Sequence, residues 1–173
     1  LQELLGEALS AGEEIRRQVV GGVLAGMSVG ISASGAVRTC MMEMEAVDLA
    51  RHLIGGLTVG ELECIYMEGL ARSSLTAAVA GPDAFILPPL PNTLFTRDSS
   101  SWIYDGVSIN PMYWPARQPE ALNAATIYHH HPMFSTARFR YWFPLNGDEK
   151  QNPSMDYTRS SLEGGDVMPI GNR

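Results

Sequence analysis

The sequence predicts an α+β chain in which a helical segment, residues 1–81, precedes a mixed segment, residues 82–173. Two observations lead to this fold class. Apolar residues in the first segment recur at steps of three and four, which is the period of an amphipathic helix. In the second segment, runs rich in β-branched and aromatic residues surround one helix-like stretch, which indicates a ββαβ arrangement. The pattern changes near Gly81 and Pro82, where we expect the boundary.

The composition is that of a globular protein with an apolar core. Of the 173 residues, 45% are hydrophobic and 18% are charged, as in ordinary folded domains. The net charge of −7 disfavours nucleic acid as a partner, because phosphate binding requires a basic face. Cys40 and Cys64 do not make a disulfide framework, and we expect both to be buried as small apolar residues.

An uncharged stretch, residues 19–37, carries glycine at every fourth position from Gly22 to Gly30. Its length approaches a membrane span, and the glycine spacing resembles a membrane packing motif. Few of its side chains are large and apolar enough to drive insertion. We therefore expect a helix–loop segment with close backbone packing and no membrane partner.

Helices in the first segment are predicted from apolar period and from their ends. The longest amphipathic stretch runs from Val37 to Ile54, and the glycine pair at 55–56 is a natural C-cap for it. Thr58 and Glu61 have the spacing of a capping box, which marks the start of a further helix. The predicted helices cover residues 1–9, 13–20, 37–54 and 58–71.

The second segment is predicted to contain a hairpin, a helix and further strands. Asp105-Gly106 joins two strand-like runs, which is typical of a type I′ hairpin turn. Pro119 is tolerated in the first turn of a helix, and the glycine pair at 164–165 would mark a bulge or a close backbone approach. The predicted strands are 102–104, 107–110, 138–143 and 161–170, and the predicted helix is 120–128.

Three consecutive histidines, residues 129–131, follow the predicted helix. Side chains of neighbouring residues rarely converge on one ion, and no spaced set of cysteines or carboxylates accompanies them. We therefore expect a solvated helix end and no metal site.

The segment that leads into the hairpin is irregular, and loops held by a rigid sheet are a common place for binding residues. Residue types alone favour ordinary roles there: Asp98 caps a turn, Asn92 forms an Asx-turn and Phe95 packs in the core. Glu163 and Arg117 are on the same basis surface charges or members of ion pairs.

Three blocks of the second segment resemble bacterial arginine deiminases. They are Pro-Leu-Pro-Asn-Thr-Leu-Phe-Thr-Arg-Asp (89–98), Asn-Pro-Met-Tyr-Trp-Pro-Ala-Arg (110–117) and Leu-Glu-Gly-Gly-Asp-Val-Met-Pro-Ile-Gly (162–171). The blocks follow that family's order at about its spacing. The clear resemblance covers about residues 85–173, and it is weak over residues 1–80.

This resemblance implies a cytoplasmic enzyme that hydrolyses L-arginine to L-citrulline and ammonia. In the family, a cysteine thiolate attacks the guanidinium carbon, ammonia leaves, water cleaves the thiouronium intermediate, and a histidine shuttles protons. No metal or organic cofactor is needed. The implied fold is a five-bladed, pentein-like propeller of ββαβ units with an inserted helical domain. We expect a homo-oligomer, since an uncovered propeller edge invites association.

The expected site residues match the two ends of arginine. The guanidinium is a planar cation, best held by carboxylates that accept paired hydrogen bonds, and two carboxylates would also orient its carbon for attack. The substrate's α-carboxylate requires a planar cation. By resemblance, Asp98 and Glu163 bind the guanidinium, Arg117, Asn92 and Phe95 bind the rest of the substrate, and Asp166 orients its neighbours.

The sequence departs from the complete family pattern, because the catalytic histidine and cysteine blocks are not matched. Cys40 and Cys64 do not match the cysteine block. We therefore expect a fragment of a longer protein that carries part of a deiminase site and is inactive alone. Two alternatives remain: another guanidino-modifying enzyme, such as an amidinotransferase or dimethylarginine hydrolase, or a non-catalytic arginine-binding or oligomerisation module.

Overall fold

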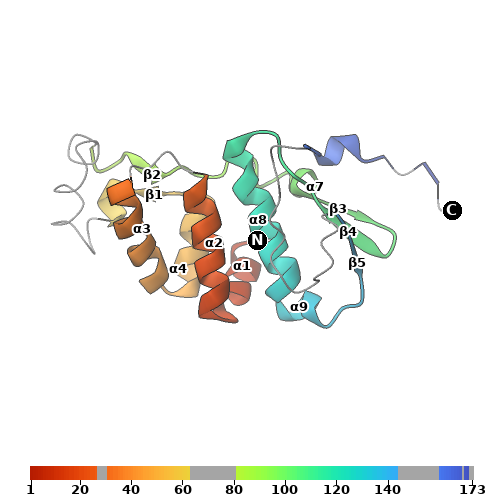
Figure 1. The fold of residues 1–173 in the computed structure, drawn as a ribbon, viewed down its shortest axis with the longest axis horizontal. Helices are drawn as coiled ribbons and strands as arrows, with labels where there is room; N and C mark the ends of the chain where they lie inside the picture. Colours follow the sequence, from red (N-terminus) through yellow and green to blue (C-terminus); the bar gives the residue numbers. More distant parts are fainter. Residues whose placement is uncertain (27–30, 63–80, 144–159, 169, 172–173) are drawn as a thin grey trace. The chain divides into compact units, whose positions relative to one another are not determined.

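The computed structural model describes residues 1–26, 31–62, 81–143, 160–168 and 170–171 (Figure 1). The chain divides into two compact units, Leu1–Leu90 and Pro91–Arg173, whereas the sequence pattern placed a boundary after residue 81. Helices dominate the first unit and the second combines helices with a sheet, so the mixed α+β class is confirmed. No helix among the described residues is long and apolar enough to cross a membrane.

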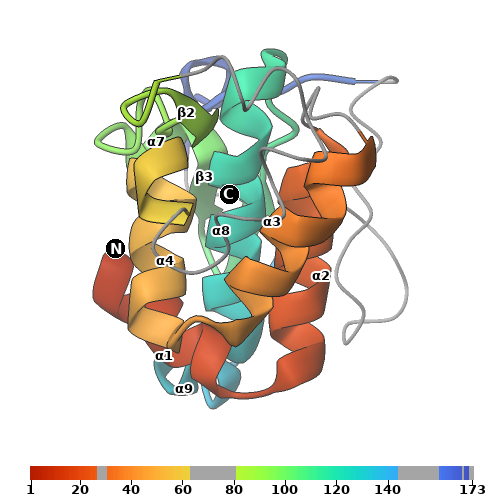
Figure 2. The same cartoon turned by 90° about the vertical axis from the view of Figure 1, so that its left-hand side faces the viewer.

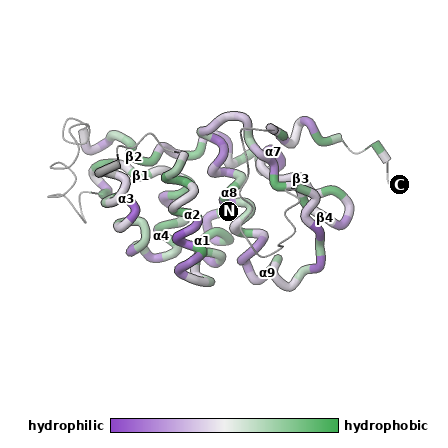
Figure 3. Tube along the Cα trace, viewed as in Figure 1, coloured by the Kyte–Doolittle hydropathy of each residue, from purple (hydrophilic) through white to green (hydrophobic). Residues whose placement is uncertain are grey.

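Helices of the first unit pack in pairs, with α1 against α4 and α2 against α3 (Figure 2). Apolar and polar residues occur together in these helices (Figure 3), and the buried apolar residues form a core that includes Leu5, Leu9, Val20, Met41 and Leu53. The helices are α1 (Gln2–Ser10), α2 (Glu13–Ala25), α3 (Ile31–Glu43) and α4 (Ala46–Gly55), and a two-stranded sheet pairs β1 (Leu57–Thr58) with β2 (Phe85–Leu87).

The single helix predicted over residues 37–54 is wrong, because the chain breaks between α3 and α4. Glu45 has an extended backbone with ψ 147°, and the guanidinium of Arg16 donates a hydrogen bond to the carbonyl of Met44 at the end of α3. The break turns Val47, which the apolar period placed in the core, out to 62% exposure. The contact with Arg16 that stabilises this break comes from another helix, so the local pattern did not reveal it.

The predicted helix ends nearby are confirmed. Gly56 caps α4 with φ 87°, and a Cβ there would lie 2.7 Å from the carbonyl oxygen of Leu87, so both conformation and space require glycine. Thr58 and Glu61 form the capping box, with the Thr58 N–H 2.9 Å from Glu61 Oε2 and the Glu61 N–H 3.3 Å from Thr58 Oγ1. The hydrogen bond from the Thr58 N–H lowers the pKa of Glu61. The rest of the helix predicted over residues 58–71, and Cys64 with it, lies outside the described residues.

The second unit is built on a three-stranded sheet in the order β3-β4-β5, with β3 antiparallel and β5 parallel to β4. Helix α8 lies between β4 and β5 in the chain, which gives the predicted ββαβ order. The apolar core of the second unit includes Val107, Ile109, Met112, Ala121 and Ala125. The elements are α7 (Thr96–Ser99), β3 (Ser100–Ile103), β4 (Gly106–Ile109), η1 (Pro115–Arg117), α8 (Gln118–His130), α9 (Pro132–Ser135), β5 (Arg140–Phe143) and η2 (Gly164–Asp166).

The β3–β4 hairpin is confirmed, but its turn lies one residue earlier than predicted. Ile103 pairs with Gly106, so Tyr104 and Asp105 form the turn. Among the described non-glycine residues, Tyr104 alone has a positive φ, 53°, whereas a type I′ turn needs two such residues. Gly106 is required for another reason: a Cβ there would lie 2.6 Å from Nε1 of Trp142 on β5.

Two predictions at the end of the second unit are wrong. The strand expected over residues 161–170 is replaced by a 3₁₀ turn, η2, although the close approach predicted for its glycine pair is real, as described below. The histidines are not a solvated helix end: the ring of His129 stacks on Tyr141 with centroids 4.5 Å apart, and His131 is buried. Burial lowers the pKa of His129 to about 4.

The burial of His129 predicts that the second unit loses stability in mild acid. The folded pKa lies below the ordinary value of 6.5, so the stabilisation is complete above pH 6.5 and is lost as pH falls toward 4. Urea unfolding followed by tryptophan fluorescence should show uptake of about one proton across this range.

The matched control is His129→Phe, which keeps the stacked ring. The buried Nε2 of His129 has no hydrogen-bond partner to lose. In this variant the free energy of unfolding should depend less on pH. A smaller pH dependence should remain from His130, because burial also lowers the pKa of His130. An unchanged slope in the variant would contradict the assignment.

Candidate active site

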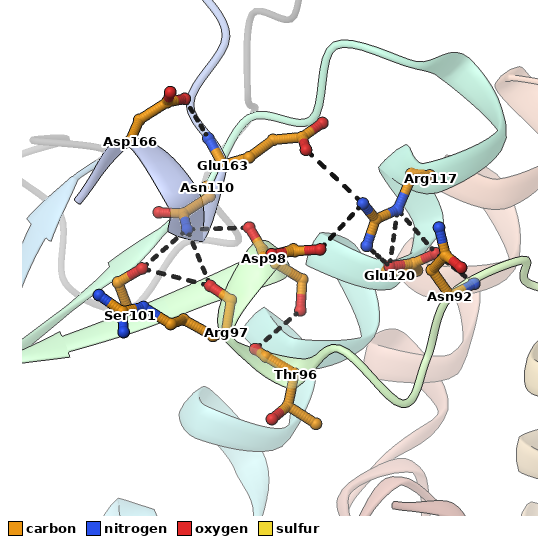
Figure 4. Close-up of polar contacts among 11 residues, drawn as sticks. Asn92, Thr96, Arg97, Asp98, Ser101, Asn110, Arg117, Glu120, Glu163 and Asp166 are labelled. Carbon is orange, nitrogen blue, oxygen red and sulfur yellow. Dashed lines mark hydrogen bonds and ion pairs between the residues drawn. The ribbon is translucent and has the colours of Figure 1, made fainter. Parts of the chain in front are cut away.

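Asp98 lies in α7, directly before β3, and its backbone is fixed from the end of β4 (Figure 4). Asn110 is fully buried, and its Nδ2 lies 2.9 Å from the carbonyl oxygen of Asp98 and 3.0 Å from Oγ of Ser101. An amide buried at the end of a strand therefore holds the C-terminal end of the short helix, where Asp98 lies. Sequence reasoning did not single out Asn110, although it opens the second of the three quoted blocks.

Glu163 is the N-cap of η2, and Asp166 orients it. The Glu163 N–H donates to Asp166 Oδ2 at 3.0 Å within a capping box. Gly164 brings this turn against α7, because a Cβ there would lie 2.2 Å from the carbonyl oxygen of Arg97. The glycine therefore places the carboxylate of Glu163 beside the helix that carries Asp98.

The guanidinium of Arg117 joins these two carboxylates. Its Nη1 lies 3.1 Å from Asp98 Oδ2 and 3.6 Å from Glu163 Oε2 (Figure 4). The Arg117 side chain is 9% exposed, and those of Asp98 and Glu163 are about one third exposed, 28% and 33%. The two acidic residues thus face a common centre, and both contact the same guanidinium nitrogen.

Glu120, in the first turn of α8, holds the other edge of Arg117. Arg117 Nη2 lies 2.9 Å from Glu120 Oε2, and Nε lies 3.3 Å from both carboxylate oxygens. This hydrogen bonding raises the pKa of Arg117. Sequence reasoning missed Glu120, although an acidic residue three positions after an arginine at a helix start is a recognisable pair.

The two remaining predicted residues, Asn92 and Phe95, lie near the Arg117 guanidinium and its carboxylates. Asn92 contacts them through the backbone, since its N–H donates to Glu120 Oε1 at 3.2 Å. Phe95 is 62% exposed and is not a core residue. It lines a pocket of about 570 Å³ together with Leu94, Thr96, Arg97, Asp98, Gly164, Gly165, Val167 and Met168.

The site can therefore hold a planar cation with an apolar stem. Asp98 and Glu163 together are called the clamp below. Because three carboxylates face one arginine side chain, a second guanidinium would find hydrogen-bond acceptors at the clamp. Phe95 and Met168 offer apolar surface in the adjoining pocket. Within the described ranges, no group of three or more His, Cys, Asp or Glu side chains is arranged to hold a metal ion.

Cys40 is buried, as predicted, and lies in the first unit. Burial raises the pKa of its thiol, so it lacks the thiolate character that a nucleophile requires. The side chain is therefore a core residue of the helical unit, as its small apolar character indicated.

The second unit thus combines a ββαβ order with three carboxylates gathered around the guanidinium of Arg117. Comparison with protein families agrees: a sequence model described as arginine deiminase matches residues 1–173. The chain belongs to the arginine deiminase family. The match includes residues 1–80, where the resemblance of the sequence was weak, and it confirms the resemblance drawn from the three blocks.

The contact between η2 and α7 predicts different effects for two adjacent glycines. Gly164→Ala should destabilise the second unit by about 1–3 kcal/mol, because the added methyl group meets backbone that cannot move aside easily. Gly165→Ala is the matched control, since nothing lies within 4 Å of a Cβ at that position. Urea unfolding of both variants measures the difference, and equal stabilities would show that η2 does not pack on α7 as described.

Proposed function

We propose that this chain supplies the substrate-binding part of an arginine deiminase, which hydrolyses L-arginine to L-citrulline and ammonia. The observation that carries the proposal is the convergence of Asp98 and Glu163 on one guanidinium nitrogen, at 3.1 and 3.6 Å. Carboxylates that hold the guanidinium of a side chain have the chemistry to hold that of a free amino acid. Membership of the family supports the reaction type.

Each side chain has a role in this proposal. The carboxylates of the clamp bind the substrate guanidinium, hold its charge and orient its planar carbon for attack. Phe95 packs on the aliphatic stem, and Arg117 and the amide of Asn92 bind the α-carboxylate and its surroundings. Asp166 holds the backbone of Glu163 and acts through it.

The covalent step requires groups beyond these. A cysteine thiolate adds to the guanidinium carbon and ammonia leaves with a proton from a histidine. Water then adds to the thiouronium carbon, and the thiolate departs to leave the urea group of citrulline. Cys40 is excluded by its burial, so we assign the nucleophile and the proton shuttle to the two family blocks that this sequence does not match.

The proposal extends to architecture and context. We propose that the ββαβ unit is one blade of a five-bladed propeller, in which residues 1–81 are an inserted helical domain and residues 82–173 carry half of the site. In the sheet that the structure describes, β3 and β5 are edge strands, and such edges favour pairing with further strands or a second copy. Cytoplasmic location and homo-oligomerisation complete the proposal.

Binding of L-arginine to the purified chain should depend on both carboxylates of the clamp. Calorimetry should detect binding to the unchanged chain and a loss of at least about tenfold in affinity for Asp98→Ala and for Glu163→Ala, since each removes a charge-assisted hydrogen bond. Asp105→Asn is the control, because this exposed carboxylate pairs with Arg140 at the hairpin. Equal binding by all four proteins would exclude the clamp as the guanidinium site.

The purified 173-residue chain should release no citrulline from L-arginine at enzymatic rates, even where it binds the substrate. The reason is that it contains no cysteine or histidine block that matches the family's catalytic groups. A colorimetric citrulline assay measures this directly, and turnover at ordinary enzymatic rates would overturn the division of roles proposed here.

A further inference from the structure

The clamp already holds a guanidinium, namely that of Arg117. Its Nη1 contacts both carboxylates of the clamp (Figure 4). A ligand guanidinium presents the same planar set of N–H donors as an arginine side chain. If the clamp binds substrate as proposed above, Arg117 and the ligand compete for the same oxygen atoms.

The contacts of Arg117 are stronger on one edge than on the other. Nε and Nη2 share the two oxygens of Glu120, with the shortest separation 2.9 Å, and the Glu120 side chain is only 3% exposed. Toward the clamp, Nη1 makes one hydrogen bond of 3.1 Å to Asp98, and its 3.6 Å separation from Glu163 exceeds hydrogen-bond length. The edge that faces the clamp is therefore the one that can be released.

We propose that Arg117 is a built-in competitor for the guanidinium position and that Glu120 is the positioning residue that anchors it during exchange. A ligand guanidinium takes the place of Nη1 at Asp98 and Glu163, and the rigid guanidinium of Arg117 turns away from the clamp as a whole while it stays paired with Glu120. Nη1 is then available to the carboxylate of the same ligand. This inference rests on the proposed function and adds a device for ligand selection to it.

The site should discriminate between ligands by whether they give Arg117 a new partner after they displace it from the clamp. Arginine releases Arg117 from the clamp with its guanidinium and offers it a new partner with its α-carboxylate. Methylguanidine, which has no carboxylate, displaces Arg117 and offers nothing in return. Discrimination between them thus arises from a contact that only the complete ligand restores.

The test measures binding of methylguanidine and L-arginine to the chain and its variants by calorimetry. In the double variant Arg117→Met/Glu120→Gln, the competitor and its buried partner are removed together, which avoids leaving one charge unpaired. Methylguanidine should bind about tenfold more tightly, as expected if Arg117 fills the clamp in about nine molecules of ten. Arginine should bind more weakly, because its carboxylate loses its partner.

The single variant Glu120→Gln separates positioning from general damage. Without the anchoring charge, Arg117 is drawn toward the clamp, so methylguanidine should bind more weakly than to the unchanged chain. Adding Arg117→Met should reverse that loss. A purely structural role of Glu120 predicts weaker binding in both variants and no reversal.

Two controls address the charge. Arg97→Gln removes a positive side chain that lines the same pocket but donates to the carbonyl of Val167, and it should give a much smaller gain for methylguanidine. Methylammonium, a cation without the planar fork, should gain little in the double variant. Equal gains in Arg97→Gln, or no gain in the folded double variant, would overturn the inference.

The outcomes also separate this inference from the proposed function. If arginine binds through Asp98 and Glu163 but methylguanidine gains nothing in the double variant, only the competitor role fails. If neither ligand binds the unchanged chain or any folded variant, the proposed function fails together with it.

Discussion

The second unit depends on neutralising one buried guanidinium. Moving the charge of Arg117 out of water is costly, and the cost is offset only if partners accept its hydrogen bonds. Those partners come from three places in the chain: Asp98 in α7, Glu120 at the start of α8, and Glu163 before η2. The ion cluster therefore holds together segments that the sheet alone does not connect, and one of its carboxylates, that of Asp98, also lines the pocket.

Close backbone approaches are the second constraint, and they explain two glycines that the sequence suggested for partly different reasons. Gly106 was interpreted as a turn residue, yet the space it provides is taken by Trp142 of β5. Gly164 was expected to mark a bulge or a close approach, and the approach is to the backbone of Arg97. A glycine in a sequence indicates that a side chain is absent, but only the fold shows which neighbouring group occupies that space.

Predictions succeeded where the cause is local and failed where it is distant. The capping box at Thr58, the C-cap at Gly56 and the helix after Pro119 each depend on residues within one helical turn. The break before α4, the 3₁₀ turn at Glu163 and the burial of His129 depend on contacts with other elements. The site followed the same division: the resemblance supplied Asp98 and Glu163, whereas Glu120 emerged only from its contacts.

Arg117 shows why a residue's role in a site and its role in a fold need not exclude each other. The sequence offered two interpretations, a ligand for the substrate carboxylate and a member of an ion pair, and the structure places the side chain in ion pairs. Nη1 nevertheless lies between Asp98 and Glu163 and hydrogen-bonds only the first, so the carboxylate of Glu163 makes no hydrogen bond to this guanidinium. A site with surplus acceptors favours the arrival of a second planar cation. In the proposed function, the ion pairs that stabilise the second unit therefore also hold together the carboxylates that bind a free arginine.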